Sequence, residues 1–190
     1  MADRQLDTLV ICGSLRKGSY NAALARSLPA WAPPGLKLRD APSFEKMPIY
    51  NHDIQDTTGF PPEANAWADA IRSADAVIIV SPEYNWSIPG GLKNAIDWVS
   101  RMKEQPFKDK PVALQSCAGG ILGGSRMQYH LRQSLTSIDA FLFGRPEVIV
   151  TFAPQKFDPK TLELKDQTAI DLIKQQLAGF EKFVRRLHPN

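Results

Sequence analysis

Hydrophobic residues occur in short runs rich in β-branched side chains, and stretches with helical spacing separate these runs. The runs predict buried strands at residues 8–12, 76–81, 111–116 and 146–151, with a weaker candidate at 36–38. Apolar positions repeat with helical spacing from about residue 22 and within 64–71, 88–99, 127–138 and 170–187. Because continuous apolar strands are typical of parallel sheets covered on both faces, the alternation predicts a three-layer, doubly wound α/β fold.

Glycine and proline mark some of the expected boundaries. Gly90 opens the third helical stretch, and Gly123 and Gly124 open the fourth. The segment 42–62 is polar and rich in proline, so we expect it to be a loop over one edge of a ligand site.

Composition narrows the class of protein. With 190 residues and 43% hydrophobic composition, the chain is expected to form a single domain over residues 1–190. The net charge of +3 comes without blocks of like charge, which argues against nucleic-acid binding. No apolar run approaches the length of a membrane span, so we expect a cytoplasmic protein. Cys12 and Cys117 are far apart and each ends an apolar run, as core residues do.

The loop after the first strand has the chemistry of a phosphate site. Ligands of open α/β sheets bind at the carboxyl ends of the strands, and a helix N-terminus presents free N–H groups to an anion. Hydroxyl, guanidinium and amide groups that could add to these N–H donors are carried by Ser14, Arg16, Ser19 and Asn21. The alternative is an ordinary helix cap by Ser19 beside a solvated Arg16.

Two further loops could frame a planar ring. The loop after the third strong strand places Tyr84 and Trp86 between prolines, where they can offer an apolar surface. Burial under the following helix is the alternative for both aromatic residues. Ser116 and the glycines after the fourth strand permit a ligand to approach the backbone. Together the three loops predict a site for a mononucleotide with a planar head.

No side chains form a catalytic group of their own. The three histidines, His52, His130 and His188, lie apart from any cysteine or aspartate at a catalytic spacing. The aspartates do not cluster as metal ligands would. We therefore assign no catalytic residue and no metal site.

Combined motifs in these loops resemble the NADPH-dependent FMN reductase family, and within it the bacterial quinone and chromate reductase branch. The resemblance rests on Gly13-Ser14-Leu15-Arg16 with Ser19 and Asn21, on Pro82-Glu83-Tyr84-Asn85, and on residues 89–98, which read PGGLKNAIDW. It implies a flavodoxin-like fold with a five-stranded parallel sheet of order 2-1-3-4-5. It also implies bound FMN, on which the chemistry takes place, with NADPH or NADH as electron donor.

The same resemblance implies roles for individual residues. The FMN phosphate would contact Ser14, Arg16, Ser19 and Asn21, and the ring would lie among Pro82, Glu83, Tyr84, Asn85 and Ser116. Quinones would be the acceptors, with chromate a further candidate, and the two substrates would react in turn by a ping-pong mechanism. A homodimer or homotetramer would be held together through Arg126, Tyr129 and Glu147. Trp86 departs from the tyrosine or histidine of many relatives, which leaves the acceptor preference open.

Three other functions share this topology. A flavodoxin-type electron carrier typically has an acidic docking surface, which the charge of +3 does not favour. A phosphoacceptor signalling domain needs aspartates at strand ends where this chain has Cys12-Gly13 and Ser81-Pro82. A reductase that releases reduced FMN as its product stays open.

Overall fold

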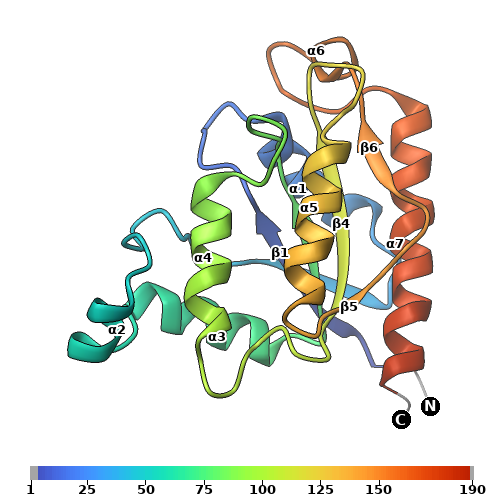
Figure 1. Cartoon of the computed structure of the whole chain (residues 1–190). Helices are drawn as coiled ribbons and strands as arrows, with labels where there is room; N and C mark the ends of the chain where they lie inside the picture. The colour runs from blue at the N-terminus through green and yellow to red at the C-terminus, as the bar shows by residue number, and fades with distance from the viewer. Residues whose placement is uncertain (1–3, 189–190) are drawn as a thin grey trace.

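The computed structural model describes residues 4–188, in which six parallel strands form one sheet. The strands are β1 (Leu6–Cys12), β2 (Leu36–Asp40), β3 (Ala76–Val80), β4 (Pro111–Cys117), β5 (Phe141–Leu142) and β6 (Val148–Val150). Their order is β2-β1-β3-β4, with β5 and β6 both paired to the outer edge of β4. This arrangement confirms the flavodoxin-like order 2-1-3-4-5, with the fifth strand divided in two (Figure 1).

The division of the fifth strand is the main difference from the expected strands. β5 pairs with the start of β4 at Pro111 and Val112, whereas β6 pairs with its end. Gly144 and Pro146 lie between the two pieces, and a proline has no N–H to donate to a ladder. The strand expected over 146–151 is therefore limited to β6, and the two-residue β5 is too short to leave a sequence pattern.

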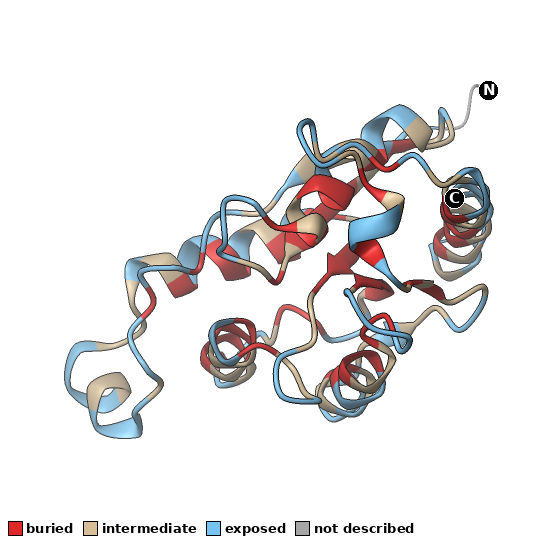
Figure 2. Ribbon diagram, turned by 90° about the horizontal axis from the view of Figure 1, so that it is seen from above, coloured by how far each residue is buried: buried red, intermediate tan, exposed pale blue. Residues whose placement is uncertain are grey.

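Helices cover both faces of the sheet. They are α1 (Tyr20–Trp31), α2 (His52–Thr58), α3 (Pro62–Ser73), α4 (Gly90–Ser100), α5 (Ser125–Thr136), α6 (Ala153–Lys156) and α7 (Gln167–Leu187). Trp67, Leu92 and Met127 of α3, α4 and α5 pack on one face, and α1 and α7 bury Leu24 and Phe180 on the other. Alternate strand residues point into the two cores, which confirms the three predicted layers (Figure 2).

The segment 42–62 is not the plain loop that its composition suggested. Residues 52–58 form α2, whose N-cap Asn51 accepts a hydrogen bond from the N–H of Asp53 at 2.8 Å. No residue of α2 is buried, and the helix projects from the body of the protein (Figure 1). Phe44 and Met47, by contrast, are buried in the core. The expectation failed because a polar helix with a single side-chain cap has no apolar stripe to reveal it.

Candidate functional site

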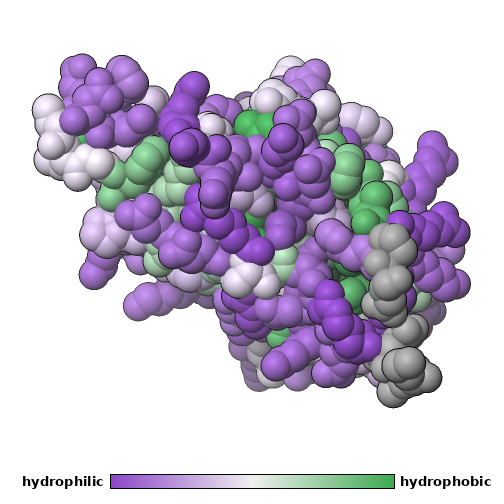
Figure 3. Space-filling model, turned by 90° about the horizontal axis from the view of Figure 1, so that it is seen from below, coloured by the Kyte–Doolittle hydropathy of each residue, from purple (hydrophilic) through white to green (hydrophobic). Residues whose placement is uncertain are grey.

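Exposed apolar side chains gather on the loops at the carboxyl ends of the strands. The loops that follow β1, β3, β4 and β6 carry six large exposed ones: Leu15, Tyr84, Trp86, Ile121, Leu122 and Phe152. The view from below shows the opposite end of the sheet, and that face is mainly hydrophilic (Figure 3). Because ligands of open α/β sheets bind at the carboxyl ends of the strands, this edge is the candidate site.

The β1–α1 loop is shaped by a close contact between two strands. A Cβ atom on Gly13 would lie 2.3 Å from Oγ of Ser81, so only glycine allows β1 to end beside β3 in this way. Ser19 caps α1, and its Oγ accepts a hydrogen bond from the N–H of Ala22 at 3.3 Å. Because the cap uses only the acceptor side of the hydroxyl, the Ser19 O–H remains able to donate to an anion.

The same loop leaves several backbone donors available. Among residues 4–188, no protein atom accepts a hydrogen bond from the N–H groups of Lys17, Gly18, Tyr20 or Asn21. These donors stand at the positive end of the α1 dipole, with the exposed Arg16 beside them. A phosphate group therefore fits the donor set of this loop.

Asn21 makes a contact that the sequence could not indicate. Its Nδ2 donates to the carbonyl oxygen of Cys117 at 2.9 Å, and its Oδ1 accepts from the Cys117 N–H at 3.0 Å. The Asn21 side chain is buried, so this pair of bonds ties the start of α1 to the end of β4. The role of Asn21 as a phosphate ligand remains a prediction. In this structure its amide joins the β1–α1 loop to the end of β4.

The loop after β3 is a tight hairpin with a left-handed turn. The backbones of Tyr84 and Ser87 exchange two hydrogen bonds of 3.0 and 2.9 Å. The two residues between them have positive φ angles, 48° at Asn85 and 65° at Trp86. Asparagine tolerates this conformation, whereas a bulky tryptophan rarely adopts it. The turn exposes 48% of Tyr84 and 65% of Trp86, so neither aromatic residue is buried under α4.

Glu83 and Ser116 connect these loops to α5 through hydrogen bonds. A carboxylate oxygen of Glu83 accepts a hydrogen bond from the N–H of Met127 at 3.0 Å, in the first turn of α5. The buried hydroxyl of Ser116 accepts from Nε2 of Gln128 at 2.9 Å. Gly124 covers it, because a Cβ on Gly124 would lie 2.9 Å from the Ser116 oxygen. Contact of Glu83 and Ser116 with the ring remains a prediction. In this structure their side chains contact α5.

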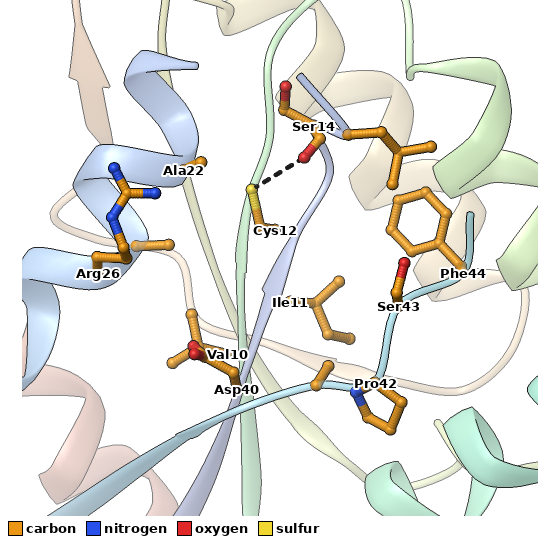
Figure 4. A pocket seen from close by; sticks show the side chains of 13 residues that line it. Val10, Ile11, Cys12, Ser14, Ala22, Arg26, Asp40, Pro42, Ser43 and Phe44 are labelled. Carbon is orange, nitrogen blue, oxygen red and sulfur yellow. Dashed lines mark hydrogen bonds between the residues drawn. The ribbon is translucent and has the colours of Figure 1, made fainter. Parts of the chain in front are cut away.

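A cavity of about 310 Å³ lies on the other side of the phosphate loop, between β1, α1 and the segment after β2. Its walls include Cys12, Ser14, Arg26, Asp40 and an apolar floor (Figure 4). Cys12 is half-buried here, so it is not the plain core residue that was expected; burial raises the pKa of its thiol. No residue of the loops after β3 and β4 lines this cavity, so it does not coincide with the predicted ring site.

The three residues expected at a subunit contact have different surroundings. The Arg126 guanidinium lies 3.8 Å from the centre of the Trp86 ring, and Tyr129 is exposed. Glu147 lies 3.6 Å from Arg132 in an ion pair. In the described part of the chain no helix is long and apolar enough to cross a membrane.

Comparison with known proteins identifies the family. Residues 6–155 match the model of the family described as NADPH-dependent FMN reductase. The chain belongs to this family. Among its relatives, a quinone reductase of Escherichia coli is 46% identical over 183 residues, covering 96% of this chain and 97% of the relative. An NAD(P)H-dependent FMN reductase of Pseudomonas aeruginosa is 43% identical over 182 residues, again covering 96% and 97%.

A solved structure similar to this one is that of the flavoenzyme FerB, an NAD(P)H:(acceptor) oxidoreductase from Paracoccus denitrificans. It superposes with a TM-score of 0.84 at 27% identity and covers 95% of this chain and 98% of its own. The FMN reductase fold and the identity of the family, both expected from the loop motifs, are thus confirmed.

Four residues at this edge were not predicted from the sequence. Ile121, Leu122 and Phe152 contribute to the exposed apolar edge, and His130 hydrogen-bonds the hairpin through Ser87. The pair Ile121-Leu122 between glycines is a signal in the sequence, because a glycine-rich segment indicates a loop and loops run over the protein surface. The contact of His130 has no sequence signal, since 43 residues separate it from Ser87.

Proposed function

We propose that this protein is an FMN-dependent oxidoreductase that passes a hydride from NAD(P)H to quinones. The observation that carries the proposal is the pairing of two features on one edge of the sheet: free N–H groups at the start of α1, and exposed aromatic residues on the β3–α4 hairpin. The quinone reductase of Escherichia coli and the family match support the same activity.

The residues of the first loop would hold the phosphate of FMN. Arg16 would supply a fixed positive charge, and the hydroxyls of Ser14 and Ser19 would add donors to the backbone N–H groups. Asn21 fixes the distance between this loop and the end of β4 through its two bonds to Cys117. Its contribution to FMN binding would then be largely architectural.

The ring would lie along the hairpin. Pro82, Tyr84 and Asn85 would offer apolar and polar contacts to it, with Glu83 and Ser116 holding the hairpin and the facing loop against α5. When bound, FMN supplies the hydride chemistry, so the chain needs no acid or base of its own for that step. The protein's part is to orient the reactants and to leave one face open to each in turn.

Steady-state kinetics test the proposal. Because donor and acceptor would occupy the same open face, double-reciprocal plots at several fixed quinone concentrations should give parallel lines. Intersecting lines would contradict a shared face. Desalting before the assay separates a bound cofactor from a released product, because an enzyme that retains FMN keeps its activity without added flavin.

We also propose that the protein assembles into a homodimer or homotetramer and that chromate is a further acceptor. Arg126, Tyr129 and Glu147 carry the assembly proposal, because Arg and Tyr are favoured at interfaces and the exposed Tyr129 is free to contact a second copy. A monomeric mass by light scattering at micromolar concentration would contradict it. A cytoplasmic location stays a prediction.

A further inference from the structure

Helix α5 contacts the β3–α4 hairpin through two side chains that lie one helical turn apart. The guanidinium of Arg126 lies over the face of the Trp86 ring, 3.8 Å from its centre. Nδ1 of His130 is 2.9 Å from Oγ of Ser87, within hydrogen-bond distance. Residues at i and i+4 share one face of a helix, so both contacts come from a single stripe of α5.

These contacts act on a segment whose backbone would otherwise favour another conformation. Asn85 and Trp86 both have positive φ, and for tryptophan this region costs conformational free energy. Two hydrogen bonds close the turn, between Tyr84, which is exposed, and Ser87, which is partly exposed. A strained turn persists only where neighbouring residues hold it in place, and here those neighbours are on α5.

We propose that Arg126 and His130 are positioning residues, which hold the hairpin 84–87 in its left-handed turn and so fix the surface on which ring and acceptor lie. That this surface receives the ring and the acceptor rests on the proposed function, whereas the contacts of Arg126 and His130 with the hairpin do not. It gives His130, for which we assigned no catalytic role, a part in the site through Ser87. It also gives Arg126 a contact within its own chain.

A third contact with α5 lies at the base of the hairpin. Glu83 accepts a hydrogen bond from the N–H of Met127, between Arg126 and His130 along α5. The hairpin is thereby attached to the helix at its base, its tip and its return strand. In Figure 1 the loop that leads into α4 lies beside the upper end of α5.

Hydrogen exchange of the hairpin amides tests this directly, with or without FMN bound. The variants are Arg126→Ala and His130→Ala, with His130→Asn as the conservative change that keeps a side-chain hydrogen-bonding group near Ser87. Gln133→Ala is the matched control, because Gln133 is exposed on α5 and is no part of the site. Both alanine variants should raise exchange of the Tyr84 and Ser87 amides by roughly tenfold, while His130→Asn restores protection and the control changes nothing.

A second measurement separates positioning from general stability. In the FMN-loaded enzyme, His130→Ala should raise the KM for benzoquinone by about threefold to tenfold with a smaller change in kcat, since the surface and not the hydride step is altered. Unchanged exchange in both alanine variants would overturn the proposal, whatever the activity. If the alanine variants alter exchange but the protein binds no FMN, the positioning role of Arg126 and His130 is supported and the proposed function is contradicted.

Discussion

Replacing Asn21 by alanine tests whether its amide joins two loops or serves only a ligand. The change removes the bonds of 2.9 and 3.0 Å to the backbone of Cys117 and leaves a buried N–H and a buried carbonyl group without partners. Each of the two unpaired groups costs about 1–3 kcal/mol, so the apo protein should lose about 2–6 kcal/mol of unfolding free energy. With a urea dependence of roughly 2–3 kcal/mol per M, the unfolding midpoint should fall by about 1–3 M.

Urea unfolding of the FMN-free protein, followed by circular dichroism, measures this loss without any contribution from the ligand. Asn65→Ala is the matched control, because Asn65 is exposed and makes one side-chain hydrogen bond, to the carbonyl of Phe60 at 3.2 Å. The control should change stability by less than about 0.5 kcal/mol. An Asn21→Ala variant that unfolds at the same urea concentration as the parent, yet binds FMN weakly, would refute the architectural role and assign the amide to the phosphate.

Three further predictions address other parts of the molecule. Arg16→Ala should weaken FMN binding by about 1.5–3 kcal/mol in a fluorescence titration, and unchanged affinity would remove Arg16 from the site. Tyr84→Ala should lower quinone turnover while costing under about 1 kcal/mol of stability in urea, because the side chain is half exposed; a loss of about 3–5 kcal/mol would mean a buried role. The Arg4 guanidinium lowers the pKa of Asp75, so the Asp75 contribution is present at pH 7 and is lost as the pH falls through that lowered value. In urea unfolding, Asp75→Ala should be less stable than the parent at pH 7, and this difference should shrink as the pH is lowered; a difference that stays constant into acid would refute the linkage.

Much of the fold follows from short-range patterns. β1, β3 and β4 are apolar runs whose alternate residues enter the two cores, and such runs are visible in the sequence. The short pieces of the sheet edge are different, because β5 has two residues and depends on its pairing with Pro111 and Val112. A two-residue strand is too short to show the alternation that marks the longer strands, so the sequence pattern cannot indicate it.

The site was predictable in outline and not in its contacts. Loop chemistry placed Ser19 at a helix start and Tyr84 at a surface, and both positions agree with the structure. The side chains of Asn21 and Ser116 instead turn toward Cys117 and Gln128, because α1 and α5 meet the end of β4 only in the folded protein. Polar residues at strand ends serve both ligands and neighbouring loops, and only tertiary structure distinguishes these uses.

Anaerobic titration of the purified protein with NADPH, monitored by absorbance, shows directly whether bound FMN carries electrons from nicotinamide to quinone. We expect a yellow protein with about one FMN per chain, full loss of the flavin absorbance with about one equivalent of NADPH or NADH, and its full return with about one equivalent of benzoquinone. A protein that retains no FMN after desalting, or a bound flavin that neither nicotinamide reduces, would contradict the proposed function.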